Sequence, residues 1–435
     1  MTRSDNKPDD KTRPRHGANE DNLGHKDNKA PLTGNLPMAQ WEFVGLMAAL
    51  MALNALAIDT MLPALDDISR HFTLQNPNAQ QWIIFAYILG FGVPQLIVGP
   101  LSDRFGRRVI LRISLGFYSL CGFACMFAPS FGALLAIRLV QGIAASGTRV
   151  SAVAIVRDVV KGRNMARIMS LIMTIFMIVP IIAPLLGQGV LMISDWRWTF
   201  GILGVLSVLT YIWTEWRLPE TLPISRRNPL NTGHIARAYK TILTHPVSRG
   251  YMIASGIVYG ALFAFIASSE QIFREIFGKE HTFAFWFSAI ALALSCGTFS
   301  NSKIVETYGM RRISHTALIV FILLSLMNYM LTLAIGPTLI IFFPLFAVTF
   351  ACFGMFGTNF SALAMEPLGK ISGTGSAAYG FATTTFASVF GWIVASQYDG
   401  RLNGVLLGYA ALGALSLTVV IITEKGKLFR LTPDR

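Results

Sequence analysis

Long apolar runs alternate with short polar connections along most of the chain. Residues 82–100 contain no charged side chain, and residues 109–128 contain only Arg112. A helix that crosses the hydrocarbon core of a bilayer needs about 20 mainly apolar residues. The pattern therefore predicts twelve membrane helices, at residues 41–63, 82–101, 109–128, 131–155, 166–190, 198–216, 250–272, 282–302, 313–335, 338–362, 374–397 and 403–423.

Composition agrees with an all-α polytopic membrane protein. Hydrophobic residues make up 53% of the chain and charged residues 14%, whereas a soluble domain carries about 25% charged residues. The alternation with period two that a membrane β-barrel requires is not seen. Residues 1–36 are polar and almost without large apolar side chains, so they are predicted to form a disordered tail. They lack the apolar core of a secretory signal.

The basic residues predict how the chain lies in the membrane. The formal net charge is +13, but Lys and Arg collect in the tail, in alternate connections and at the C-terminus. The opposite connections hold only Arg70, Arg197, Arg274, Lys279 and Arg401. Cytoplasmic loops carry the excess of Lys and Arg. Both termini are therefore predicted to be cytoplasmic, and the positive charge is not interpreted as a nucleic-acid surface.

The longest internal connection divides the twelve segments six and six. The predicted parts are a tail at 1–36, a six-helix bundle at 37–218, a cytoplasmic linker at 219–248, a second bundle at 249–425 and a short cytoplasmic tail at 426–435. A shift of 203 residues places Asp103 on Glu306 and Gly106 on Gly309. This weak repeat indicates two pseudo-symmetric halves.

One basic connection carries a recognisable signature. Residues 99–108 read GPLSDRFGRR, between the second and third apolar segments. The run resembles the loop signature G-x-L-x-D-R-x-G-R-R of the major facilitator superfamily. That resemblance implies two six-helix halves that alternate in access to the two sides of the membrane.

The resemblance also implies a conformational gate. Asp103 is expected to face the start of the eleventh helix, around residues 373–378, where free backbone donors attract an anion. With Arg107 and Asp158 it would hold the cytoplasmic side shut. The residues assigned to this gate are Gly99, Asp103, Arg104, Gly106, Arg107, Arg108, Arg157 and Asp158.

Two ionisable residues inside apolar segments are candidates for proton coupling. An ionisable group costs roughly 2.5–3.5 kcal/mol at the bilayer centre, so the few that occur face an interior or a cavity. Asp59 lies in AIDTMLPAL, which resembles the D-x-x-x-P-A-L element of twelve-helix drug:proton antiporters. Its alternative role is a cap for the segment after Pro63. Arg138, with Gln141, matches the superfamily motif R-x-x-Q-G.

A cation at Arg138 would favour release of the proton from a facing carboxyl group. The alternative for Arg138 is a structural arginine bonded to backbone carbonyls. The fifth segment reads VPIIAPLLGQG, where Pro180, Pro184 and Gly187 resemble the antiporter motif G-P-x-x-G-G. It departs from the motif at Ala183 and Gln188, and an ordinary proline kink is the alternative.

Four further residues are candidates to line a substrate cavity. These are Tyr87, Gln141, Arg149 and Glu270. Arg149 lies near the inner end of its helix, so it either serves the cavity or extends to the cytoplasm. Glu270 either faces the cavity or pairs with Arg274, one turn away. His315 is interpreted as solvated at a helix end.

The chain offers no sign of a cofactor, a metal site or an enzyme. Cys121 and Cys125 lie one turn apart, but no His or carboxylate joins them as a metal ligand. A phosphate-binding G-x-x-x-x-G-K-[ST] loop is missing from the sequence, which argues against a nucleotide-driven pump. The seven histidines are scattered rather than clustered.

Over residues 38–425 the chain is similar to the Bcr/CflA branch of drug:proton antiporters. That resemblance implies a monomer in a bacterial inner membrane, with both termini cytoplasmic. It also implies export of drug-like lipophilic compounds in exchange for protons. A proton-coupled uptake symporter for a small metabolite and a membrane sensor without transport remain the alternatives.

Overall fold

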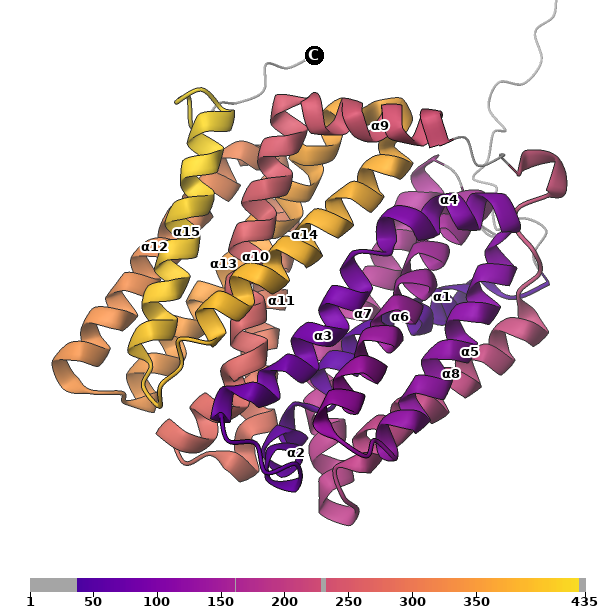
Figure 1. Cartoon of the computed structure of the whole chain (residues 1–435). Coiled ribbons are helices and arrows are strands. Elements are labelled where there is room, and N and C mark those ends of the chain that lie inside the picture. The colour runs from indigo at the N-terminus through magenta and orange to yellow at the C-terminus, as the bar shows by residue number, and fades with distance from the viewer. Residues whose placement is uncertain (1–36, 161, 228–231, 430–435) are drawn as a thin grey trace, which may run out of the picture.

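The computed structural model describes residues 37–160, 162–227 and 232–429, and these residues form helices joined by short turns (Figure 1). The predicted tail at 1–36 and residues 430–435 lie outside the described residues. The first group of helices comprises α1 (Gln40–Asp59), α3 (Trp82–Gly92), α4 (Gln95–Phe105), α5 (Arg107–Met126), α6 (Phe131–Val159), α7 (Gly162–Ile193) and α8 (Arg197–Arg217). The second comprises α10 (Pro246–Gln271), α11 (Phe283–Tyr308), α12 (Met310–Ile335), α13 (Leu339–Met365), α14 (Ser372–Ala395) and α15 (Asn403–Thr423).

Two short helices mark opposite faces of the molecule. The helix α2 (Leu65–His71) follows α1 at one face, and α9 (Thr232–Thr244) crosses the other (Figure 1). The described end of the chain, after α15, lies on the α9 face. The segment predicted as a linker at 219–248 thus contains a helix, α9, in its described part.

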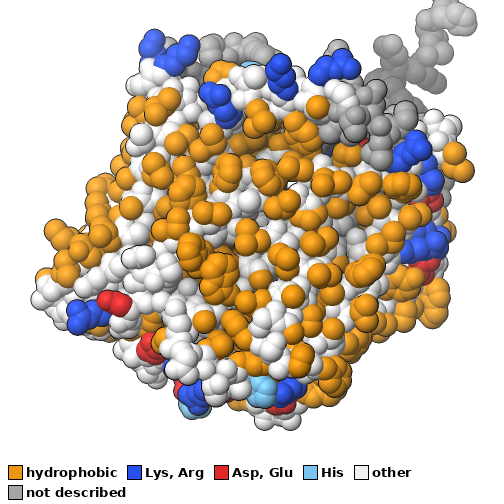
Figure 2. Space-filling model, viewed as in Figure 1, with side chains coloured by type: hydrophobic (Ala, Val, Ile, Leu, Met, Phe, Trp, Pro, Cys, Tyr) orange, Lys and Arg blue, Asp and Glu red, His pale blue; other side chains and the backbone are white. Residues whose placement is uncertain are grey.

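Most of the helices are suited to a bilayer. Among the described residues, ten helices are long and apolar enough to cross a membrane, or eleven if the bent pair α3 and α4 counts as one span. The helix α8, with 21 residues, occupies the remaining predicted segment. Hydrophobic side chains cover the middle of the face shown in Figure 2, while charged side chains gather toward its edges.

The second predicted segment, 82–101, is a bent pair of helices rather than one. The pair bends by 45° at a break between Gly92 and Gln95. Pro94 lies in this break, where its missing N–H and its ring oppose a continuous helix. The signature run 99–108 is likewise more helical than expected, because α4 extends to Phe105 and α5 begins at Arg107.

Helix packing defines two halves. In the first half α6 packs against α3 and α5, and α5 packs against α8; in the second half α13 packs against α11 and α12, and α10 packs against α14 and α15. Contacts between the halves run through α7 with α11 and through α3 and α4 with α14. The predicted fold class, a helical membrane protein of two six-helix bundles, is confirmed.

The weak internal repeat corresponds to a shared structural detail. Gly106 and Gly309 each precede a helix with positive φ, 102° and 78°. Arg108 then binds Glu215 at the end of α8 (3.0 Å), and Arg311 binds Glu424 just after α15 (2.8 Å). In each half, an arginine at the start of the third membrane segment therefore forms an ion pair with a glutamate at the end of the sixth.

Candidate functional site

Asp59 lies buried at the end of α1. Its side chain is 4% exposed, and within the described part of the chain it forms no hydrogen bond or ion pair. A carboxylate buried without a partner is costly, so its proton occupancy depends on what approaches it. The backbone of the next residue, Thr60, lies against Gly187, where a Cβ would collide with the Thr60 carbonyl oxygen. The glycine of the fifth-segment motif therefore lets α7 pack directly beside Asp59.

Arg138 is fully buried and bonded to backbone. Its guanidinium donates to the carbonyls of Ala57 (2.8 Å) and Ile83 (3.4 Å) and to the Gln141 side chain (2.8 Å). The Tyr87 ring lies 4.4 Å from its Cζ. Among the described residues, the guanidinium bonds to these acceptors and not to Asp59, and an approach of Arg138 to a carboxyl group stays a prediction. The alternative of an arginine bonded to carbonyls describes the observed state.

Tyr87 and Gln141 belong to the same cluster as Arg138. The Tyr87 hydroxyl donates to the Asn54 side chain (3.0 Å). The Gln141 amide nitrogen is buried and has no hydrogen-bond partner among the described residues. A buried donor without an acceptor is costly. This nitrogen is therefore an unused donor inside the first half.

Arg149 lies between the two halves. Its Cζ is 5.6 Å from the centre of the Phe91 ring. Tyr259 and Tyr379, both from the second half, are close enough for electrostatic interaction with its guanidinium. The Tyr379 hydroxyl and the Ser255 hydroxyl share a hydrogen bond of 3.1 Å. The sequence did not single out Tyr379, because one of 11 tyrosines, among 31 phenylalanines, carries no distinguishing pattern.

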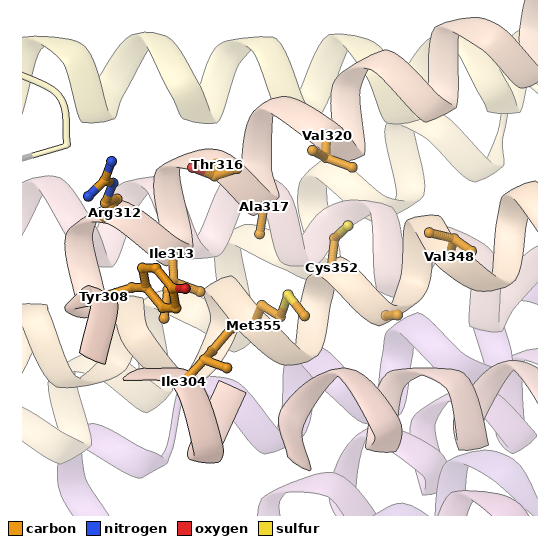
Figure 3. Close-up of a pocket in the computed structure, with 11 residues that line it drawn as sticks. Ile304, Tyr308, Arg312, Ile313, Thr316, Ala317, Val320, Val348, Cys352 and Met355 are labelled. Atoms are coloured by element: carbon orange, nitrogen blue, oxygen red, sulfur yellow. The ribbon is translucent and has the colours of Figure 1, made fainter. Parts of the chain in front are cut away.

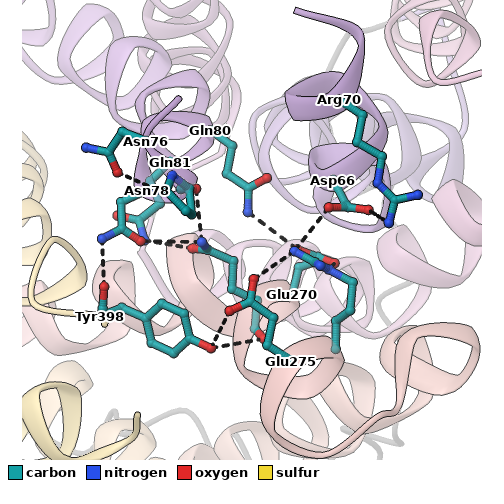
Figure 4. Close-up of polar contacts among 12 residues, drawn as sticks. Asp66, Arg70, Asn76, Asn78, Gln80, Gln81, Glu270, Glu275 and Tyr398 are labelled. Carbon is teal, nitrogen blue, oxygen red and sulfur yellow. Dashed lines mark hydrogen bonds and ion pairs between the residues drawn. The ribbon is translucent and has the colours of Figure 1, made fainter. Parts of the chain in front are cut away.

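Glu270 takes part in an ion-pair network that joins the halves on the α2 face (Figure 4). Arg274 binds Glu270 (2.7 Å) on its own helix turn and Asp66 of α2 (3.1 Å). Gln80 of the first half donates to Glu270 at 3.5 Å. The expected alternative, a Glu270–Arg274 pair, is present in the structure. Arg274 has a second partner, Asp66, which the sequence did not single out. Asp66 extends the Glu270–Arg274 pair to the first half.

Amide side chains extend this network along the same face. Gln81 donates to the Gln271 side chain (2.9 Å), and Gln271 donates to the Pro77 carbonyl (3.0 Å). Asn78 donates to the Tyr398 carbonyl (2.8 Å). We call this set the α2-face cluster; its members are Asp66, Asn78, Gln80, Gln81, Glu270, Gln271, Arg274 and Tyr398. The cluster closes this face by hydrogen bonds and an ion pair between the halves.

The acidic and basic residues of the signature bond one another within the first half. Arg107 binds Asp103 (2.6 Å) and Asp158 (2.9 Å), which joins α4, α5 and α6. Asp103 is half exposed, and its carboxylate pairs with Arg107. Arg157 lies against Gly373 of α14. A Cβ atom added at Gly373 would be 2.9 Å from the Nη1 atom of Arg157. The expected contact of Asp103 with residues 373–378 stays a prediction.

Glu220 completes the signature, although the sequence did not assign it. Its carboxylate accepts from the backbone N–H groups of Arg107 (3.1 Å) and Arg108 (3.3 Å). An anion at a helix N-terminus satisfies free donors and complements the helix dipole. Gly106 lies against this carboxylate, whereas Gly99 has no neighbour within 4 Å of its Cβ position. Arg104 is exposed.

The motif on α7 lies at the interface with the second half. Pro180 and Pro184 are both inside the helix, where each lacks a backbone donor. Between them, the Ile181 carbonyl accepts a hydrogen bond from Ser288 of α11 (2.5 Å).

His315, expected to be solvated, is instead buried and bonded to the Tyr251 hydroxyl (3.0 Å). No group of three metal-ligating side chains occurs among the described residues.

The fold and these interior charges define a class of protein. Two six-helix bundles with ionisable side chains between them form the architecture of a secondary transporter. The sequence matches the family model of the Major Facilitator Superfamily over residues 47–422, and the chain belongs to that superfamily. It is thus a multi-pass membrane transporter for small molecules, not an enzyme.

Curated relatives span nearly the whole chain at modest identity. An uncharacterized MFS-type transporter, YdgK of Bacillus subtilis, is 29% identical over 88% of this chain and 96% of its own length. The bicyclomycin resistance protein homolog of Haemophilus influenzae is 27% identical over 82% and 89%. The multidrug resistance protein MdtL of Shigella dysenteriae is 27% identical over 87% and 95%.

Solved structures share the fold. A D-xylose-proton symporter superposes with a TM-score of 0.69 at 14% identity, covering 89% of this chain and 99% of its own. A bacterial homolog of the human lysosomal transporter Spinster, in an inward-facing, unoccupied conformation, gives the same TM-score and identity over 91% and 99%. At this identity the likeness concerns architecture alone.

Proposed function

We propose that this protein exports drug-like lipophilic compounds in exchange for protons by alternating access. Two of the relatives described above are named for bicyclomycin or multidrug resistance. The observation that carries the proposal is Asp59 at the end of α1, a buried carboxyl group that has no partner among the residues the structure describes. Exchange of a proton for a drug requires a group that binds the two alternately, and an unpaired buried carboxyl group suits that task.

The proposed orientation places the α9 face in the cytoplasm of a bacterium and the α2 face outside its inner membrane, with both termini cytoplasmic. The excess of Lys and Arg in the connections of the α9 face supports it. Epitope tags added at residues 1 and 435 should resist an impermeant label in intact cells. Labelling of either tag from outside would overturn this orientation. The working unit is proposed to be a monomer.

The α2-face cluster is proposed to be the outer gate. Its contacts connect α2 and the turn Pro77–Gln81, just before α3, with the end of α10, with the helical turn Ile272–Ile276 that follows it, and with the turn after α14. For the outward-open state to form, the Asp66–Arg274 pair and the Gln81–Gln271 bond must separate. Polar pairs suit this task, since their groups regain hydrogen bonds with water when the gate opens.

The Asp103–Arg107–Asp158 triad is proposed to act on the opposite side. It holds α4, α5 and α6 together near Arg157, which lies against Gly373 of α14. Loss of the triad would free these helix ends from one another. The proposed role is therefore to keep the first half rigid while its cytoplasmic end moves against α14.

Coupling is proposed to take place at Asp59, between the two gates. With the outer gate open, Asp59 takes a proton from outside; with the cytoplasmic side open, drug binding releases that proton. Arg149, Tyr259 and Tyr379 lie where α6 meets the second half and are proposed to line the drug path. Arg138 is proposed to hold α1, α3 and α6 together through its carbonyl bonds.

Drug-induced proton release from purified protein in weakly buffered detergent solution tests the proposal, with bicyclomycin and tetraphenylphosphonium as probes. The wild type is expected to release protons as drug is added. Asp59→Asn should bind drug but release none. Glu306→Gln, which removes an exposed carboxylate elsewhere, is the matched control and should behave as wild type.

Other outcomes distinguish the alternatives. Full proton release by Asp59→Asn would remove Asp59 from the coupling role. In proteoliposomes, drug movement in the same direction as protons would indicate a symporter. Drug binding without gradient-driven movement would indicate a sensor.

A further inference from the structure

A groove with exposed lining residues, among them Tyr308 and Val348, lies on the second half, and all of its lining residues belong to that half (Figure 3). Its volume is about 460 Å³, within the range of about 300–1,000 Å³ for small-molecule pockets. The helices α11, α12 and α13 form its walls, with α13 packed against both of the others. Apart from Thr316 and the residues at one end, its lining is apolar, including Val320 of α12 and Val348 and Cys352 of α13.

The polar end of the groove contains Arg312 and Tyr308, and the opposite end contains Val320 and Val348 (Figure 3). Arg312 is exposed and has no ion pair within the described residues, whereas its neighbour Arg311 binds Glu424 and Glu366. The groove therefore combines one unpaired cation with an apolar trough.

The depth of the groove matches one leaflet of a bilayer. Arg312 lies at the start of α12, next to Arg311, which binds Glu424 after the end of α15 on the α9 face. Val320 is eight residues further on, about 12 Å deeper at 1.5 Å per residue. Half of the hydrocarbon core measures about 15 Å. The cation thus lies at headgroup level, while the apolar lining reaches toward the middle of the membrane.

We propose that this groove binds an anionic phospholipid. The phosphate pairs with Arg312, the Tyr308 hydroxyl lies at the same end, and one acyl chain occupies the apolar trough. Charge complementarity selects this occupant, because Arg312 would repel a lipophilic cation and attract a phosphate. Only the assignment to the inner leaflet rests on the proposed orientation; the site itself is independent of the proposed transport function.

Lipid titration of the purified full-length protein, read by native mass spectrometry, tests this site. The wild type should bind phosphatidylglycerol more tightly than phosphatidylcholine with the same acyl chains. Arg312→Gln should weaken phosphatidylglycerol binding about fivefold, which corresponds to about 1 kcal/mol for one basic residue near an anionic headgroup. Its phosphatidylcholine affinity should fall less, because the choline cation beside that phosphate offsets part of its attraction to Arg312.

Two further variants separate the ends of the groove. Arg249→Gln removes another exposed cation from the α9 face and should leave the lipid preference unchanged. Val348→Trp, at a side chain that is 53% exposed, should obstruct the trough and weaken binding of both lipids. Inorganic phosphate should not compete, because it lacks the acyl chain.

Several results would overturn the proposal. These are equal affinities of the wild type for the two lipids, an unchanged preference in Arg312→Gln, unchanged binding in Val348→Trp, or full competition by inorganic phosphate. Displacement of phosphatidylglycerol by bicyclomycin at equal concentration would assign the groove to drug entry instead.

Discussion

The hydrogen bonds of individual buried residues in this protein are made with residues far away in the sequence. Arg138 illustrates this, since its acceptors Ala57 and Ile83 come from α1 and α3 while it lies on α6. Its sequence motif indicated a buried cation. The geometry showed that its bonds go to backbone, because the helix end that presents the Ala57 carbonyl is known only in three dimensions.

The two glycines of the signature should respond oppositely to a methyl group. Gly106 has φ 102° and ψ 153°, a conformation that costs other residues about 1–3 kcal/mol, and its Cβ would meet Glu220. Gly106→Ala should therefore lower the thermal unfolding temperature in detergent. Gly99→Ala, inside α4 with open space around it, should leave that temperature unchanged or raise it. Equal effects of the two substitutions would contradict this account of the α4–α5 turn.

At the scale of helices, close approach of α7 to α1 depends on one glycine. A methyl group at Gly187 would collide with the backbone of Thr60, whereas Gly189, two residues on, has no neighbour within 4 Å of its Cβ position. Overpacking of this kind costs about 1–3 kcal/mol. Gly187→Ala should therefore reduce both stability and proteoliposome transport.

Gly189→Ala provides the matched control on the same helix. It should retain wild-type stability and transport. If Gly187→Ala were equally harmless, the direct packing of α7 beside Asp59 would not matter for function. The pattern G-Q-G did not distinguish these two positions, since only the facing helix decides which glycine is in contact.

At the scale of the whole molecule, the two halves must separate on the α2 face for the proposed cycle to proceed. A Gln81→Cys, Gln271→Cys double variant places thiols where two side chains now share a 2.9 Å hydrogen bond. A short, reducible methanethiosulfonate cross-linker should join them and stop transport. Reduction should restore it.

The native cysteines favour this experiment. Cys121, Cys125 and Cys352 are buried, and only the exposed Cys296 needs replacement by Ser. Each single variant, treated with the same reagent, should keep its transport rate. Undiminished transport by the cross-linked double variant would show that this face does not open during the cycle.

The sequence by itself determined the number of apolar segments, their division into two halves and the family. The length of an apolar segment and the signature 99–108 are local properties of the sequence, so they can be recognised without a structure. It also identified the unusual charges, Asp59, Arg138, Arg149 and Glu270, because an ionisable group inside an apolar run is conspicuous at any position.

Only the tertiary structure decided the partners of these charges. Whether Arg274 joins Asp66 across the halves, whether Arg157 lies at Gly373, and whether His315 is buried depend on which helix faces meet. Helix rotation and the bend between α3 and α4 set those faces. Since packing between segments distant in sequence leaves no periodic signal, these contacts could not be predicted from the order of residues alone.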